Sequence, residues 1–249
     1  MQTTAIENIN KAHDLIYQAY EEESENKARK LIAKAIKLDP NNADAYNFLG
    51  SISDDCQTAI SYFEKGMKAG KHSIGESAYQ ELKGHFWGFH ETRPFMRAKA
   101  GVAECLNELG KKDQAIKHYQ EMLILNPNDN QGIRSLLMTL LIETRDFVAF
   151  RKLKKIYKGE ITADWLYNIA LYQFIQNGDC KQANKAIVIA TEINKYVLDY
   201  LFGRKDLPDE VSDFYSIGSD EEAILYVGSN GHLWLDTKDA LHWLAKQVR

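Results

Sequence analysis

The chain has 249 residues, 45% of them hydrophobic, and its 31 basic and 35 acidic residues give a net charge of −4. This composition suffices for a sizeable core, while the mixed order of the charges provides no basic field that would attract nucleic acid or an anionic membrane. The three cysteines, Cys56, Cys105 and Cys180, are isolated, which argues against a disulfide framework and for a reducing compartment.

Targeting signals are the next feature that the sequence excludes. No apolar run approaches the ~20 residues that a membrane-spanning helix needs. The N-terminal residues lack the basic start and apolar block of a signal peptide. We therefore expect no membrane span and a cytoplasmic location, or export by a route without an N-terminal signal peptide.

Residues 1–69 predict two helical hairpins. A first helix, capped by Thr3 or Thr4, should run to about residue 22, and a second should follow Ser24 and end at residues 39–40. The second helix carries a small, a large and a small apolar residue at the spacing typical of a tetratricopeptide unit, and a proline closes it. In the next unit Tyr46, Leu49 and Gly50 match the aromatic-x-x-Leu-Gly signature of a first helix, and Ala59, Phe63 and Gly66 repeat the second-helix pattern.

Residues 70–92 interrupt the repeat as an insertion. Residues 76–83 could form one or two helical turns, and Gly84 and Gly88 flank an aromatic patch of Phe86, Trp87 and Phe89. Thr92 or Arg93 should cap the next helix, with Pro94 in its first turn.

Residues 93–195 contain three units in one register, because Ala115, Ala149 and Ala183 are spaced by 34 residues, the length of a tetratricopeptide unit. Residues 196–249 predict a degenerate last pair that closes the array. Ser219 and Glu222 form a capping box, and Asp236 or Thr237 should cap the final helix.

These elements predict an all-α fold. We expect a right-handed α-solenoid of antiparallel helix pairs, like that of tetratricopeptide repeat (TPR) proteins, with five to six repeats over residues 1–249 as a single domain. Such a scaffold usually holds partners, and the periodicity itself does not identify them.

Residues 35–71, the insertion and residues 196–226 also resemble the tetratricopeptide-like soluble part of the suppressor of tumorigenicity 7 family. The similarity covers roughly residues 33–244 in the same order. The shared insertion after the second unit and the proline-containing segment before the last pair carry most of it. The resemblance implies an interaction scaffold and provides no catalytic residues to carry over to this chain.

The main candidate site is the concave groove that first helices of stacked pairs line. Arginines, amides and large aromatic side chains on the faces opposite the packing residues make a mixed surface suited to a peptide or protein. The expected partner-binding residues are Tyr17, Asn47, Ser51, Arg97, Glu104, Arg134, Met138, Trp165, Asn168 and Tyr172, with Asn10, His13 and Asp44 on the same faces. Where tetratricopeptide proteins that bind acidic chaperone tails carry lysine and asparagine, this chain has His13 and Tyr17, which disfavours that ligand.

A possible second site lies in the insertion, where Trp87, His90, Glu91 and Arg93 crowd one short segment. It could be a polar site of an enzyme or small-molecule sensor, or a structural plug whose aromatic side chains fill the gap in the array. Metal binding by His85, His90 and Glu91 is disfavoured by the spacing of the two histidines.

The basic run at residues 150–159 fits a solvated outer face better than a nucleic-acid or lipid patch. The leading hypothesis is therefore a non-enzymatic scaffold without cofactor or metal, which binds a protein or peptide in its groove. A homo-oligomer formed through an exposed end helix is also possible.

Overall fold

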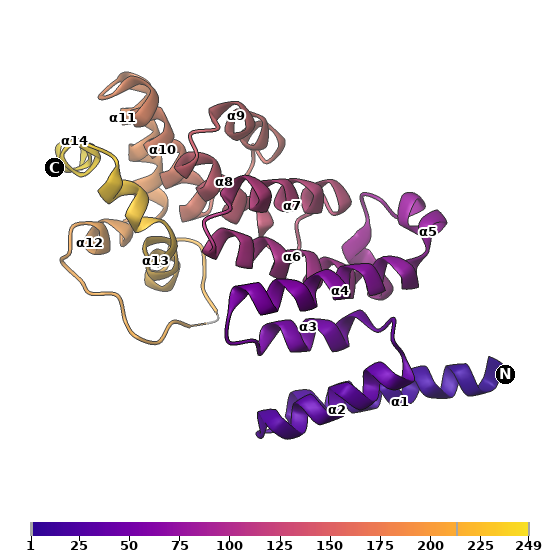
Figure 1. The fold of residues 1–249 in the computed structure, drawn as a ribbon. Coiled ribbons are helices and arrows are strands. Elements are labelled where there is room, and N and C mark those ends of the chain that lie inside the picture. The colour runs from indigo at the N-terminus through magenta and orange to yellow at the C-terminus, as the bar shows by residue number, and fades with distance from the viewer. Residues whose placement is uncertain (1, 213, 249) are drawn as a thin grey trace. The chain divides into compact units, whose positions relative to one another are not determined.

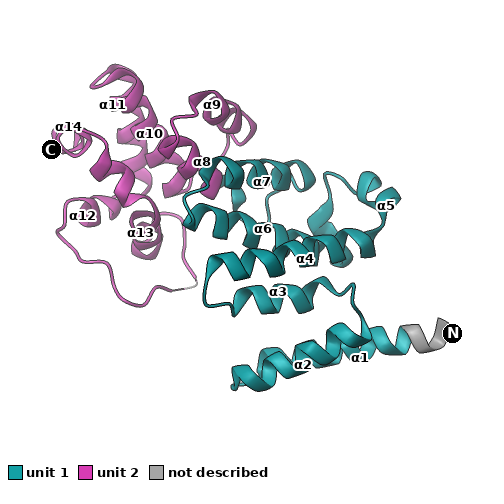
Figure 2. Ribbon diagram, in the orientation of Figure 1, with its two compact units in different colours: residues 1–134 teal, residues 135–249 magenta. Residues whose placement is uncertain are grey.

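The computed structural model describes the backbone of residues 2–212 and 214–248, with side chains from residue 6 on. Every regular element in these residues is a helix, as Figure 1 shows. The chain divides into two compact units, residues 1–134 and 135–249 (Figure 2). Helix α8 (Ile133–Glu143) crosses this division, and one continuous solenoid over the whole chain stays a prediction.

Unit 1 is built from helix pairs that short turns join. The pairs α1/α2, α3/α4 and α6/α7 match the first three predicted units, and short helices fill the insertion. Because α4 continues to Ile74, the insertion begins later than the sequence pattern suggests. The elements are α1 (Gln2–Glu21), α2 (Glu25–Leu38), α3 (Ala43–Ser51), α4 (Cys56–Ile74), α5 (Glu76–Glu81), the 3-10 helices η1 (Phe86–Gly88) and η2 (His90–Thr92), α6 (Arg93–Glu108) and α7 (Lys112–Leu125).

Unit 2 continues with further helix pairs. Ser219 caps α13 as expected, since its hydroxyl oxygen accepts a hydrogen bond of 3.2 Å from the Glu222 backbone N–H. The expected cap of the last helix at Asp236 or Thr237 is wrong, because α13 runs through Asp236 and α14 starts after Asp239. Besides α8, the elements are α9 (Phe147–Ile156), α10 (Ala163–Asn177), α11 (Lys181–Ile193), α12 (Val197–Leu201), α13 (Asp220–Asp236) and α14 (Ala240–Gln247).

The first hairpin shows how the small and large residues create the core. Alanines let α1 and α2 approach closely, and one isoleucine from each helix fills the space between them. Full burial of each isoleucine contributes about 2 kcal/mol. The buried residues are Ala12, Ile16, Ala19, Ala28, Ile32 and Ala35.

Phe63 explains two glycines of unit 1. A Cβ atom on Gly50 of α3 or on Gly101 of α6 would lie 2.6 Å from its ring, closer than van der Waals contact allows. The ring of α4 therefore sits against bare backbone on two neighbouring helices, which is why the aromatic-x-x-Leu-Gly signature ends in glycine here.

The insertion packs against unit 1 through Phe86, which is fully buried. Its ring meets Tyr79 and Phe95 edge-on, with centroids 5.0 and 6.0 Å away. The Thr92 hydroxyl donates to the carbonyl oxygens of Phe86 and Phe89, which fixes the turn before α6. Phe86 acts as the structural plug that the sequence suggested, whereas Phe89 is exposed.

Candidate functional site

Unit 1 contains a groove of about 980 Å3 between α1 and the start of α6. Its floor consists of the turn between α2 and α3 and of the last turns of α4. One wall presents α1 side chains, and the other presents η2 and the first turns of α6. The α1 wall contains Ile9, His13, Ile16, Tyr17 and Tyr20, and the opposite wall contains His90, Glu91, Arg93, Pro94 and Arg97.

The α1 wall arises from helical periodicity, because the five positions share one side of the helix. Ile16 is buried toward α2, whereas Tyr17 and Tyr20 are 70% and 59% exposed. Tyr20 is held in place by an edge contact with Phe48 of α3, with ring centroids 4.9 Å apart. Partial burial, and after it the negative charge of Asp44, raises the pKa of Tyr20, so its hydroxyl remains a hydrogen-bond donor.

Arg97 on the opposite wall is fixed by Asp44 from the floor. Its Nη2 donates to Asp44 Oδ2 at 2.9 Å and its Nε donates to Asp44 Oδ1 at 3.2 Å, a bidentate arrangement. Asn47 supports this pair, because its Nδ2 donates to Asp44 Oδ1 at 3.2 Å and to the Pro94 carbonyl at 2.9 Å. The guanidinium is therefore oriented before any ligand arrives, which lowers the entropy lost on binding.

The insertion contributes the rim of the groove. Arg93 lies over the Trp87 ring at 5.5 Å, and its Nε donates to the Trp87 carbonyl at 2.9 Å. His90 and Glu91 are exposed. Among the described residues these side chains make no hydrogen bond with Arg93 or with each other, although the enzyme alternative would need such contacts. His90, Glu91 and Arg93 instead face the groove that Tyr17 and Arg97 line.

The other predicted residues of unit 1 take no direct part in this groove. Asn47 is buried and acts behind Asp44. Ser51 is exposed, but its hydroxyl donates to the Phe48 carbonyl at 2.9 Å. Glu104 lies further along α6, where burial and then the nearby Glu108 raise its pKa. Arg134 is half-buried, with Nη1 3.5 Å from Asp129 Oδ2.

The predicted groove residues of unit 2 are not open for contact. Met138, Trp165, Asn168 and Tyr172 are at most 6% exposed, so this part of the prediction is wrong. On α10 the physical reason is α13, which packs against this helix and contacts Asn168 through Asn230 and Tyr226. Tyr172 is also stacked on Phe150 of α9, with centroids 4.3 Å apart.

A buried hydrogen-bond network joins α10 to α13. Asn230 accepts from Asn168 Nδ2 at 3.0 Å and donates through its own Nδ2 to Asp164 Oδ1 at 3.0 Å. The Tyr226 hydroxyl donates to Asn168 Oδ1 at 3.1 Å and accepts from the Trp234 indole N–H at 2.7 Å. Buried polar groups that satisfy one another in this way specify how two helices pack. Asn168 is therefore a structural residue.

Asp164 makes this network sensitive to pH. Burial, and after it the negative charge of Glu222, raises the pKa of Asp164 from 3.8 to about 6. Between these values the folded chain binds more protons than the unfolded chain, so stability falls as pH rises. We expect Asp164→Asn, which still accepts from Asn230, to be more stable than the wild type above pH 6 by as much as ~3 kcal/mol.

Urea unfolding at a series of pH values tests this expectation. The difference between Asp164→Asn and the wild type should shrink as pH falls from 6 toward 4, because the wild-type carboxyl becomes neutral there. Glu192→Gln, an exposed charge neutralisation on α11, provides the control and should change the pH profile little. A constant difference between variant and wild type at all pH values would contradict the assignment.

Several residues that line the groove were not predicted from the sequence. Ile9 and Tyr20 follow the same helical side as Tyr17 and could have been found by extending that pattern. His72 and Ser73 could not, because the sequence placed them in the insertion and the structure places them at the end of α4.

Three further expectations concern metals, thiols and membranes. Among the described side chains, no group of three or more histidine, cysteine or acidic residues could hold a metal ion. The cysteines are free, and Cys56 Sγ donates to Glu108 Oε2 at 2.8 Å, which raises its pKa to about 12. None of the helices in the described part of the chain is both long and apolar enough to cross a membrane.

Comparison with solved structures supports the fold. The crystal structure of YrrB, described as a TPR protein with an unusual peptide-binding site, matches with a TM-score of 0.50 and 20% sequence identity. The match covers 76% of this chain and 85% of that chain. No protein-family model and no curated protein matches the sequence. The helix pairs and this likeness define an all-α, TPR-like α-solenoid and confirm the predicted fold class.

Proposed function

We propose that the protein is a non-enzymatic scaffold whose groove in unit 1 binds a peptide segment of a partner protein. The observation that carries this proposal is the exposed pair Tyr17 and Tyr20, which faces an arginine already held by Asp44. Exposed aromatic and arginine side chains are the residue types that dominate binding energy at interfaces. The likeness to YrrB, itself a TPR protein with a peptide-binding site, supports the same class of function.

The two walls favour a ligand of mixed chemistry. Ile9 and the tyrosine rings offer apolar contact area to a large side chain of the peptide. Arg93, Arg97 and the backbone around the α2–α3 turn offer hydrogen bonds to its polar groups. A peptide in extended conformation exposes both kinds of group along one edge, so it fits better than a flat protein surface.

The enzyme or sensor alternative has less support. It needs His90, Glu91 and Arg93 to contact one another, whereas Arg93 is engaged by the Trp87 ring and carbonyl and no hydrogen bond among the described residues joins it to His90 or Glu91. The resemblance to the suppressor of tumorigenicity 7 family and the cytoplasmic location remain predictions from the sequence.

A peptide selection followed by calorimetry tests the groove. Peptides selected from a random phage library on the full chain should lose at least about tenfold in affinity with Tyr17→Ala or Tyr20→Ala, because each removes a solvent-exposed aromatic anchor. Gln18→Ala serves as the matched control, since Gln18 is exposed on the same helix and does not line the groove. Selected peptides that bind both tyrosine variants as tightly as the wild type would refute the proposal.

A further inference from the structure

The outer face of α9 exposes apolar and basic side chains together. Its inner residues Phe150 and Leu153 are buried, whereas Val148 and Ile156 on the opposite side are 58% and 68% exposed. Lys152 and Lys155 share this exposed side, Lys158 follows in the turn after α9, and none of the three forms an ion pair with a described residue. We call this surface the α9 face: Val148, Lys152, Lys155, Ile156 and Lys158.

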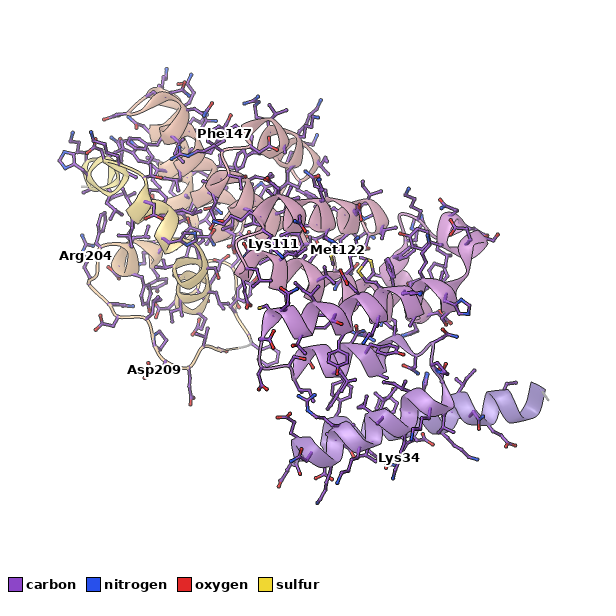
Figure 3. The ribbon with its side chains drawn as sticks, in the orientation of Figure 1. Lys34, Lys111, Met122, Phe147, Arg204 and Asp209 are labelled. Carbon is purple, nitrogen blue, oxygen red and sulfur yellow. The ribbon has the colours of Figure 1, made fainter. Side chains whose placement is uncertain are left out.

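The loop between α12 and α13 has the opposite character. Its large apolar side chains Leu207, Val211 and Phe214 are exposed, Phe214 by 85%. Its acids Asp206, Asp209 and Glu210 are also exposed, and they too lack an ion pair with any described residue. Figure 3 shows Asp209 at the outer edge of this segment, and the name 204–217 loop refers below to its described residues, 204–212 and 214–217.

The base of the loop is anchored even though its middle is exposed. Lys205 Nζ lies 2.8 Å from Asp220 Oδ1, and the Tyr200 hydroxyl donates to the other oxygen of Asp220 at 2.9 Å. The loop therefore leaves unit 2 from a fixed point. Long loops without secondary structure in compact domains are commonly binding segments.

We propose that two copies of this chain associate by seating the 204–217 loop of each copy on the α9 face of the other. Three unpaired acids meet three unpaired lysines, and exposed apolar side chains on both surfaces become buried together. In Figure 1 the loop and α9 lie on opposite sides of unit 2. A second copy provides the complement.

Reciprocal seating closes the assembly as a two-fold dimer. Each contact then occurs twice, and the second forms within the complex that the first has created. Because the paired charges lie at the surface, association should weaken as salt is raised. Unit 1 takes no part in this contact, so the proposal does not depend on the peptide groove.

Charge reversal tests the contact in sedimentation equilibrium on the full chain. The variant Lys152→Glu/Lys155→Glu/Lys158→Glu should raise the dimer dissociation constant by about 100-fold, because attraction becomes repulsion at both contacts. The loop variant Asp206→Lys/Asp209→Lys/Glu210→Lys should do the same. The control Lys30→Glu/Lys34→Glu/Lys37→Glu changes charge equally on the exposed face of α2 and should leave dimerisation intact.

Complementation provides the decisive result. A mixture of the lysine-reversed and acid-reversed variants should form a heterodimer with affinity near that of the wild type, since both of its contacts again join opposite charges. Circular dichroism of each variant should match the wild type. A wild-type chain that stays monomeric, or a mixture that fails to associate, would overturn the proposal. So would a monomer whose α9 lysines are needed only for binding phosphatidylserine vesicles.

Discussion

Gly70→Ala should destabilise unit 1 by about 2–3 kcal/mol, because overpacking between two helices cannot be relieved at this position. A Cβ atom at Gly70 would lie 2.9 Å from Phe95 Cβ and 3.1 Å from its Cα. These atoms belong to the first turn of α6 and cannot rotate away. The Phe95 ring is also held, since its centroid lies 5.6 Å from that of Tyr79 in an edge contact.

Urea unfolding monitored by circular dichroism measures this loss. Gly228→Ala is the matched control, because Gly228 lies inside α13 and a Cβ atom there would meet nothing within 4 Å. That substitution should stabilise the protein by about 0.5–1 kcal/mol through helix propensity. Equal stabilisation by both substitutions would show that α4 and α6 lie further apart at Gly70 and Phe95 than these distances indicate.

Gly70 also shows which part of the fold the repeat pattern does not predict. The repeat pattern placed it at the first position of the insertion, whereas it belongs to α4 and contacts α6. Helix pairs could be predicted because each one buries small and large residues at fixed spacing. The path of the insertion could not be predicted in this way, because it depends on how the Phe86 ring packs against Tyr79 and Phe95.

The groove residues divide in a similar way between the two units. Tyr17 and Arg97 could be chosen from the sequence, because first helices of stacked pairs expose one face in a regular order. The same rule failed at Trp165 and Asn168, since it assumes that no other segment covers that face. In unit 2 Asn230, more than sixty positions after Asp164, closes the face from α13. No local sequence pattern around α10 predicts this contact with α13.

Glu222 leads to the prediction with the largest effect. It is 2% exposed, and its carboxylate accepts from the backbone N–H groups of Ala163 and Gly218 at 2.9 and 2.7 Å and from Asn194 Nδ2 at 2.9 Å. Ala163 is the first residue of α10, and Thr162 before it provides no side-chain cap. A carboxylate from α13 therefore caps α10, where negative charge interacts favourably with the helix dipole.

Glu222→Ala should lower the free energy of unfolding by about 4 kcal/mol, because it leaves three donors without a partner in the interior. Glu221→Ala removes the neighbouring exposed carboxylate and should change stability by less than about 0.5 kcal/mol. Glu222→Ala also removes the charge that is the second cause of the raised pKa of Asp164, so that pKa should fall. Carboxyl titration by NMR in a variant that remains folded, such as Glu222→Gln, would detect this fall. An unchanged Asp164 pKa together with unchanged stability would mean that Glu222 does not join α13 to α10.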